Sequence, residues 1–297
     1  MASVRLDTVT VRHGDIVALD AIDLDVADGE FIGVIGMSGA GKTTLLRAVA
    51  GLDRITAGSL MMDDEDVTRQ DPGRRDTAMV FQHPHLLPHR SVGRNVAFPL
   101  EVRRRTAEEI RTRVHAEARA LHIDGLLERS PNELSAGEMQ LVQIARAMVR
   151  VPRVLLLDEP LARLDAHTRE HMRRELRFLQ RGYGVTTFLT TNDPTEAMAM
   201  SDRLVVLDDG RAVQVGVPID VYRQPITVTV AQLVGPLEIT TVEVTADRHG
   251  FWLRDAEGLE RAWRTSLDAY VGGRVLRGVR PDGSRLFFDA ASGVGLS

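Results

Sequence analysis

The 297-residue sequence contains no cysteine, and only 4% of its residues are aromatic. The lack of cysteine excludes a disulfide scaffold and thiolate chemistry, and it fits a reducing compartment. No apolar run approaches the roughly 18 residues that a membrane-spanning helix needs. The opening residues M-A-S-V-R-L-D also lack the apolar core of a signal peptide. We therefore expect a soluble chain that needs another protein to act across a membrane.

Lysine is nearly absent as well, because Lys42 is the only one and every other basic residue of the 37 is arginine. Acidic residues number 42, which gives a net charge of −5. This balance gives no reason to expect a nucleic-acid partner. Hydrophobic residues make up 43% of the chain, enough for the core of one large domain or of a large and a small one.

The single lysine lies in residues 31–44, F-I-G-V-I-G-M-S-G-A-G-K-T-T, around which the chain is organised. This stretch predicts a strand, a glycine-rich loop and a helix start, and it fits G-x-x-x-x-G-K-[ST], whose backbone N–H groups and helix N-terminus bind phosphate. A compact ammonium suits the space between two phosphates better than a guanidinium does. A chance glycine turn or a dinucleotide fold is the less favoured alternative, because the glycines run G-x-x-G-x-G. The predicted nucleotide-binding residues here are Gly36, Ser38, Gly39, Ala40, Gly41, Lys42, Thr43 and Thr44.

A second pattern ends in two adjacent carboxylates, Asp158 and Glu159, after the apolar run of residues 154–157. A continuous apolar run is typical of a buried parallel strand, and its last two side chains point in different directions. After a phosphate loop, Asp158 is expected to hold magnesium through water and Glu159 to act as general base towards the attacking water. The alternative is a strand end that merely meets solvent.

The remaining pattern predicts an α/β fold with an antiparallel β subdomain, a helical insertion and a small C-terminal β domain. Strands are expected near residues 4–11, 22–26, 58–62, 77–81, 185–189 and 204–207, and Gly182 is expected to end the helix that Asp165 caps. Residues 84–150 have helical character, and Thr106 and Glu109 have capping-box spacing. After about residue 235, alternating runs at 239–244, 251–254, 259–263 and 275–279 indicate strands. We predict domains at 1–234 and 235–297.

A third motif, L-S-A-G-E at residues 134–138, opens a helix. The chain resembles ABC-transporter ATPases over nearly its whole length, because its motifs follow in that family's order. These motifs are the phosphate loop, Gln82 after a strand, this signature, the D-E pair and a loop ending at Asp165. The resemblance implies a P-loop NTPase core and two nucleotide-binding domains that sandwich two ATP molecules. Ser135, Gly137 and Glu138, with Asp165, would then lie at a nucleotide bound across the interface. Gln82 would join magnesium or the attacking water to the membrane partner.

The stretches F-Q-H-P-H-L-L-P-H, N-V-A-F-P-L and G-V-P-I-D-V-Y-R-Q-P are similar to importer ATPases of the maltose and glycerol-phosphate type. This resemblance implies ATP and Mg²⁺ as cofactors, with the metal held by Thr43, Gln82 and Asp158. It implies a second ATPase subunit in a homo- or heterodimer, two transmembrane permease subunits and, indirectly, an extracytoplasmic solute-binding protein. The implied position is the cytoplasmic face of the membrane, and the implied solute is a sugar, a polyol or a related compound.

The same resemblance implies that residues 235–297 form a regulatory β domain of oligonucleotide-binding (OB) type. The family's β domain continues well beyond the motif that G-V-R-P-D matches at residues 278–282, whereas this chain ends 15 residues later. We therefore expect a shortened barrel that is incomplete or closed by a partner.

Several residues depart from the family pattern. Ala136 and Glu138 replace a glycine and a glutamine of the signature L-S-G-G-Q. The loop at residues 162–165, usually S-N-L-D, reads A-R-L-D. His13 stands where the family stacks an aromatic ring on adenine. The spacing of Ser135 and Glu138 also predicts a capping box, which would engage the serine hydroxyl.

Asn192 replaces the histidine of a T-H-D switch, and its amide donates a hydrogen bond but cannot carry a proton. Losing a preorganised donor to the developing phosphoryl charge costs on the order of a hundredfold in rate. We therefore expect slow ATP hydrolysis, and the alternative is a regulatory ATP-binding partner with little turnover. A cassette ATPase acting on DNA or ribosomes is disfavoured, because the chain lacks a coiled-coil insertion and a basic surface. The expected catalytic residues are Glu159, Gln82 and Asn192.

Overall fold

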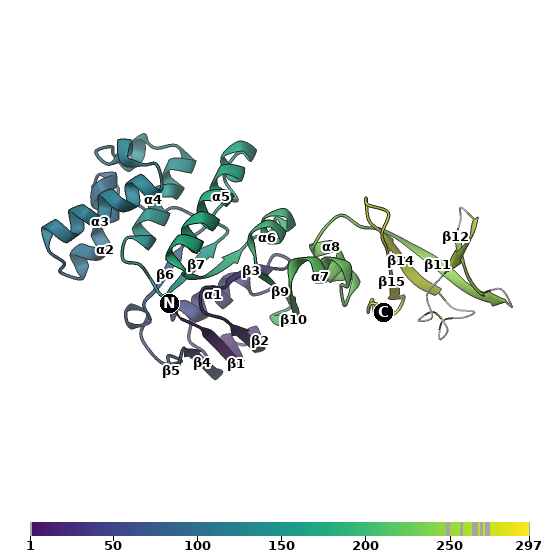
Figure 1. The fold of residues 1–297 in the computed structure, drawn as a ribbon. Coiled ribbons are helices and arrows are strands. Elements are labelled where there is room, and N and C mark those ends of the chain that lie inside the picture. Colours follow the sequence, from purple (N-terminus) through teal and green to yellow (C-terminus); the bar gives the residue numbers. More distant parts are fainter. Residues whose placement is uncertain are drawn as a thin grey trace. The chain divides into compact units, whose positions relative to one another are not determined.

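The computed structural model describes residues 2–247, 250–255, 258–262, 267, 270 and 274–296. Contacts divide the chain into two compact units, Met1–Val213 and Gln214–Ser297. Figure 1 labels their elements along the chain. The last residue of the strand predicted at 259–263 lies outside the described residues. Across the part of the chain that is described, no helix is both long and apolar enough to cross a membrane.

A six-stranded sheet carries the core of the first unit. Its order is β10(Arg211–Gly216), β9(Arg203–Asp208), β3(Phe31–Ile35), β8(Thr186–Thr190), β7(Val154–Asp158) and β6(Thr77–Val80). β3 pairs in parallel with β8 and β9, and β7 pairs in parallel with β6 and β8. β3, β7 and β8 are buried at every position; β3 and β7 therefore read largely as apolar runs, whereas β8 buries three threonines with Phe188 and Leu189. The carboxyl ends of β3 and β7 therefore deliver the phosphate loop and the D-E pair to one edge of the sheet.

A smaller antiparallel sheet lies beside the helix that follows the phosphate loop. Its order is β2(Ile16–Val26), β1(Val4–His13), β4(Ala57–Met62) and β5(Glu65–Asp66). Buried side chains of β1, β2 and β4 share one core with those of α1(Lys42–Ala50), among them Leu6, Leu24 and Leu45. The alternation of buried and exposed residues along these strands is the pattern expected of a sheet with one covered face.

The helical insertion contains α2(Val92–Val102), α3(Ala107–Ala120) and α4(Ala136–Met148), with short 3-10 turns η2(Asp124–Leu126) and η3(Pro131–Glu133); η1(Pro72–Arg74) precedes it. The hydroxyl of Thr106 accepts a hydrogen bond from Glu109 N at 3.2 Å, as the predicted cap requires. Two further helices, α5(Ala166–Tyr183) and α6(Pro194–Met200), follow the D-E pair. The prediction that Gly182 ends α5 was wrong. The helix ends at Gly184, whose φ of +64° is the left-handed conformation that glycine adopts without strain.

The second unit contains a C-terminal antiparallel sheet, where the sequence predicts a small β domain. Its order is β13(Gly258–Ala262), β12(Gly250–Asp255), β11(Glu238–Asp247), β14(Arg274–Val279) and β15(Arg285–Asp289). The unit begins upstream of residue 235, because two helices, α7(Pro218–Arg223) and α8(Val228–Leu233), belong to it, and Ala231 shares a core with Leu286 and Phe288. The domain boundary at 234/235, the OB-like closure and the regulatory role stay predictions.

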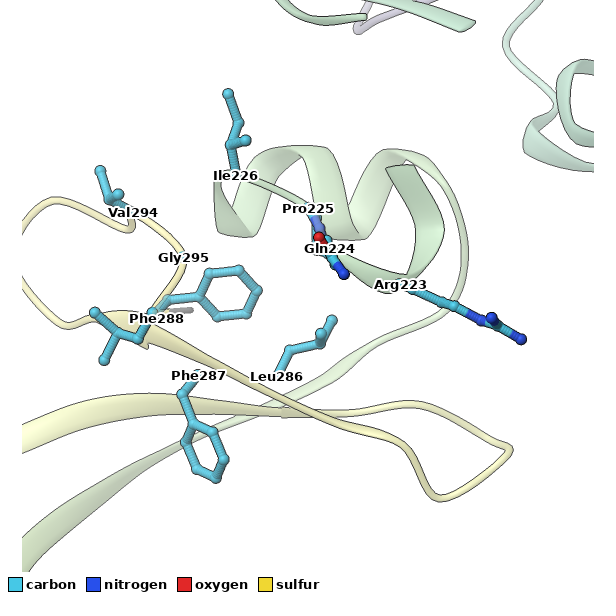
Figure 2. A pocket seen from close by; sticks show the side chains of 10 residues that line it. Arg223, Gln224, Pro225, Ile226, Leu286, Phe287, Phe288, Val294 and Gly295 are labelled. Atoms are coloured by element: carbon cyan, nitrogen blue, oxygen red, sulfur yellow. The ribbon is translucent and has the colours of Figure 1, made fainter. Parts of the chain in front are cut away.

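A pocket of about 490 Å³ lies within the second unit, between the segment after α7 and strand β15. Leu286 and Phe288 line it on the same side of the strand, whereas Phe287 points to the other side (Figure 2). The chain end closes over this region, because Gly295 N donates a hydrogen bond to Ile226 O at 2.6 Å. Among its described lining residues there is none that the sequence predicts for the nucleotide site.

Candidate functional site

The loop between β3 and α1 depends on its glycines. A Cβ on Gly36 would lie 2.4 Å from the carbonyl oxygen of Leu207. The two atoms would clash at this distance, so the position requires glycine. Gly39 and Gly41 have φ values of +84° and +102°, which other residues rarely adopt. Gly41 is also the N-cap of α1, and no side chain caps it. The first N–H groups of α1 are therefore left for an anion, as at other phosphate-binding helix ends.

Lys42 is buried at the start of α1 and folds back over the loop. Its Nζ donates hydrogen bonds to the carbonyl oxygens of Gly36, at 2.8 Å, and Met37, at 3.0 Å. Burial lowers the pKa of Lys42, while the nearby carboxylates of Glu159 and Asp158 act in the opposite direction. A phosphate at this loop would supply the negative charge that keeps the ammonium protonated.

Two hydroxyls meet the buried carboxylate of Asp158 at the end of β7. Thr43 Oγ1 lies 3.1 Å from Asp158 Oδ1, and Thr190 Oγ1 donates to the same oxygen at 2.7 Å. A carboxylate and a hydroxyl beside a phosphate loop form the oxygen-rich donor set that suits Mg²⁺. The donor set therefore fits the predicted metal at Thr43 and Asp158. The amide of Gln82, the third predicted ligand, bonds to Glu159 instead.

Both carboxylate oxygens of Glu159 are held by side-chain amides. Gln82 Nε2 donates to Oε2 at 2.9 Å, and Asn192 Nδ2 donates to Oε1 at 2.6 Å. The backbone of Glu159 has a φ of +45°, a strained conformation for this residue type. Its N–H is fixed by the carbonyl oxygen of Thr190, at 3.1 Å, and by the Thr190 hydroxyl, at 3.0 Å. The structure thus brings the three predicted catalytic residues together.

The position of Asn192 is fixed by the residues on either side of it. Thr191 Oγ1 donates to Glu196 Oε2 at 2.6 Å, and Asp193 Oδ1 accepts from Thr195 N at 2.8 Å to cap α6. Glu196 is buried, and burial raises its pKa. The amide of Asn192 therefore projects from a turn that is anchored on both sides.

The signature residues bond to one another at the start of α4. Ser135 N donates to Glu138 Oε2 at 2.7 Å, and Ser135 Oγ accepts from Glu138 N at 3.3 Å, which is the capping box that the spacing predicts. The backbone N–H of Ser135 lowers the pKa of Glu138. A Cβ on Gly137 would lie 3.1 Å from a methyl group of Thr168. Asp165 is likewise occupied as a helix cap, because it accepts from Thr168 N at 3.0 Å.

His13 lies at the end of β1, half-exposed. Its Nε2 is 3.5 Å from Oδ2 of Asp53, a carboxylate that also binds Arg47 on α1. The sequence did not indicate this neighbour. The role of His13 in stacking against adenine stays a prediction.

Two residues near the site were missed from the sequence. Thr190 supports both members of the D-E pair, and the sequence carried no clear signal for it, because it is one of three threonines in β8. Asp53 follows α1 in a polar loop, and nothing in its local sequence pattern predicts a contact with a residue forty positions earlier.

Comparisons with known proteins agree with this geometry. The ABC transporter family profile matches residues 19–162. The sn-glycerol-3-phosphate import ATP-binding protein UgpC of Escherichia coli K12 is 41% identical over 99% of this chain and 83% of its own length. The UgpC of Shigella boydii serotype 4 is 41% identical over 100% and 83%.

Two solved structures share the fold. One is a dimeric ATP-binding cassette in a post-hydrolysis state bound to ADP and Pi, with 32% identity, a TM-score of 0.65, and coverage of 72% of this chain and 98% of that one. The other is cbiO1 from Clostridium perfringens, part of an ABC transporter complex, with 28% identity, a TM-score of 0.69, and coverage of 74% and 90%. The chain therefore belongs to the ABC-transporter ATPases and, within them, to the ATP-binding, ATP-hydrolysing subunits of the carbohydrate importer family.

Proposed function

We propose that this ATPase powers the import of a glycerol-phosphate, a sugar or a polyol. The importer proteins that share about two fifths of its residues are named for sn-glycerol-3-phosphate, which supports this class of solute. The chain acts at the cytoplasmic face of the membrane, in a dimer with a second ATPase subunit and in contact with two permease subunits. An extracytoplasmic solute-binding protein takes part indirectly. The known structure that is a dimer supports the pairing of two cassettes.

The observation that carries the catalytic proposal is the pair of amide contacts on Glu159. With both oxygens held by Gln82 and Asn192, the carboxylate is fixed at the sheet edge beside the phosphate loop. Glu159 takes a proton from the attacking water, the water oxygen bonds to the γ-phosphorus of ATP, and the bond to the β-phosphate oxygen breaks to give ADP and phosphate. Because both supporting groups are neutral amides, neither can take over the proton.

The phosphates of ATP bind the open N-terminus of α1 and Lys42. Thr43 and Asp158, with the side-chain carbonyl oxygen of Gln82, would hold Mg²⁺, and the metal would neutralise the charge that develops on the phosphate oxygens. Ser38, Gly39, Ala40 and Thr44 complete the loop, and His13 stacks against adenine.

Ser135, Gly137, Glu138 and Asp165 face the nucleotide held by the partner subunit. In the isolated chain, Ser135 and Glu138 bond to one another. In this capping box Ser135 Oγ only accepts, so its O–H can still donate to a phosphate while the box is closed.

The test is Mg²⁺-dependent phosphate release by the full chain, with ATP binding measured in parallel. We expect Glu159→Gln to bind ATP and to lose turnover by about a hundredfold or more, because the general base is removed. Asn192→His is expected to raise turnover, because it restores a group that can be charged. Asp71→Asn, a change in a polar loop outside the site, is the control and leaves both quantities unchanged.

The proposal would be contradicted if the chain bound ATP without releasing phosphate, if Glu159→Gln did not change phosphate release, and if Asn192→His did not restore it. That result would instead favour the regulatory ATP-binding partner. A carbohydrate importer is tested separately by reconstitution with its permease subunits, where uptake of glycerol phosphate, maltose and an unrelated amino acid is compared.

A further inference from the structure

Two arginines of α5 lie one helical turn apart and face two acids that follow Asn192 in the chain. Arg169 Nε is 3.6 Å from Glu196 Oε1, and Arg169 Nη1 is 3.9 Å from Asp193 Oδ2. Arg173 Nη2 donates to the same oxygen of Asp193 at 3.4 Å. The side chain of Glu196 is only 3% exposed. The start of α6 is therefore held against α5 by charge pairs, one of which involves a buried carboxylate.

Arg169 also holds the loop that precedes α5. Its Nη2 donates to the carbonyl oxygen of Leu164 at 2.9 Å. The side chain of Leu164 is buried in the core of the first unit, so this loop has a fixed attachment there. A guanidinium is planar and carries five N–H donors, so it can meet a carbonyl oxygen and a carboxylate in different directions at once. One side chain thus connects the loop that ends at Asp165 with the turn that carries Asn192.

A short series of contacts leads from Arg169 to the catalytic carboxylate. The second oxygen of Glu196, Oε2, accepts a hydrogen bond from Thr191 Oγ1 at 2.6 Å. Thr191 directly precedes Asn192, whose amide donates to Glu159 Oε1 at 2.6 Å. Burial raises the pKa of Glu196, whereas its bond to Thr191 and the attraction of the arginines act in the opposite direction. Arg169 therefore supports the position of Asn192 through Glu196 and Thr191.

We propose that Arg169 is a positioning residue for ATP hydrolysis, because it fixes the turn of Asn192 to the loop that ends at Asp165 and so keeps Glu159 aligned with the attacking water. The proposal rests on the catalytic roles proposed above for Glu159 and Asn192. A displacement of about 1 Å at a reacting group can cost about a hundredfold in rate. Affinity for ATP depends instead on the phosphate loop around Lys42, so loss of Arg169 lowers kcat and leaves the dissociation constant of ATP unchanged.

The experiment compares Mg²⁺-dependent phosphate release and ATP binding in the full chain and in Arg169→Met, which keeps an unbranched side chain but removes the charge and the donors. We expect kcat to fall by about ten- to a hundredfold. The dissociation constant of ATP should change by less than about twofold. Arg169→Lys keeps the charge but not the planar fork, so its kcat should lie between those of Arg169→Met and the wild type.

Arg174→Met is the matched control. Arg174 lies on the same helix, is 72% exposed and pairs with Glu170 at the surface of α5. Exposed pairs of this kind contribute little, so this variant should keep the kcat and the ATP affinity of the wild type.

A double-mutant cycle with Asn192→Ala separates positioning from a general loss of stability. Because Arg169 acts through Asn192, Arg169→Met should lower kcat by less than about twofold further once Asn192 is alanine. A merely structural role would lower kcat by the same factor in both backgrounds. Radiolabelled ATP keeps slow variants measurable, and thermal unfolding is followed for each. Should Arg169→Met not fold, Arg169→Lys takes its place throughout.

A wild-type kcat in folded Arg169→Met would overturn the proposal. Equal factors in the two backgrounds of the cycle would overturn it as well, and so would a loss that appears in the dissociation constant of ATP instead of kcat. Failure of the proposed function looks different, because Glu159→Gln would then leave phosphate release unchanged. If only the present inference fails, Glu159→Gln still lowers phosphate release while Arg169→Met does not.

Discussion

Two helices of the first unit begin at predicted nucleotide-binding residues, and their N-termini are built in opposite ways. α1 starts at Gly41, which has no side chain, and nothing caps it. α4 starts at Ser135, whose N–H and hydroxyl are both engaged by Glu138. Each helix has unpaired N–H groups and a partial positive charge at this end. At the first, no side chain caps these groups, whereas at the second the Ser135 hydroxyl accepts from Glu138 N and the Glu138 carboxylate accepts from Ser135 N.

The difference shows that the two helix N-termini of this chain are equipped differently, because one has no side-chain cap and the other bears a carboxylate. Glu138 occupies, with its negative charge, the side of α4 that the family resemblance assigns to the partner's nucleotide. An isolated chain therefore offers phosphate one open helix end and one closed end. Substitutions at either helix end should change this difference.

The largest effect is expected at the open end, from Lys42→Arg. The ammonium fits between the carbonyl oxygens of Gly36 and Met37, and a guanidinium is too wide for that space. We expect ATP hydrolysis to fall by at least about a hundredfold in kcat/KM. Arg153→Lys, a swap of the same two residue types outside the site, should change it by less than about twofold. Near-normal activity of Lys42→Arg would show that the loop does not need its single lysine.

A substitution in the loop backbone comes next. Gly36→Ala places a Cβ 2.4 Å from the carbonyl oxygen of Leu207, so the loop must shift. We expect a loss of about 1–3 kcal/mol in the free energy of unfolding and weaker ATP binding. Gly182→Ala is the matched control, since a Cβ there meets nothing within 4 Å in the last turn of α5, and it should stabilise the fold by at most about 0.5 kcal/mol. Thermal unfolding and ATP titration decide, and equal effects of the two changes would refute the steric argument.

The closed end is tested by Glu138→Gln. The amide oxygen can still accept from Ser135 N, but the negative charge is gone. We expect ATP hydrolysis by the dimer to rise by a few fold, about 1 kcal/mol of lost repulsion. Glu133→Gln is the matched control, because Ser130 and Glu133 form the same capping box at η3, with a 2.6 Å bond from Ser130 N. Equal effects on hydrolysis would mean that the charge at the signature has no special role.

The smallest effect is on acid stability. The N–H of Ser135 lowers the pKa of Glu138 below its unfolded value of about 4.3. The ionised cap therefore stabilises the fold above that pH, and its contribution disappears as the pH falls through the lowered pKa. Because the group is largely solvated, the difference between wild type and Glu138→Gln should be under about 1 kcal/mol at neutral pH. Urea unfolding from neutral pH to about pH 3 should show this difference shrink; a constant difference would contradict the sign.

The sequence predicted those parts of the site that are local in the chain. The phosphate loop, the buried strand before Asp158 and the capping box at Ser135 each depend on residues within a few positions of one another, and each has a clear spacing. Strands of the C-terminal β domain were also predicted from their alternating runs, although not their antiparallel pairing. Strand β15, with its adjacent Leu286, Phe287 and Phe288, was not, because three apolar residues in a row break the alternation of a one-sided sheet.

What the sequence could not show depends on tertiary contacts. Thr190 supports the D-E pair only because β8 lies next to β7 in the sheet. Asp53 meets His13 only because the loop after α1 returns to the end of β1. The error at Gly182 is of another kind, since two glycines two positions apart are equally good stop signals, and only the backbone conformation of Gly184 separates them.

The comparison of the two helix ends is tested most directly by amide hydrogen exchange in the dilute, monomeric full chain, before and after ATP and Mg²⁺ are added. The account predicts that the amides of residues 38–43 become protected, while those of residues 136–139 at the start of α4 keep the exchange rates that they have without nucleotide. Protection that arises at residues 136–139 in the monomer, with no change at residues 38–43, would contradict it.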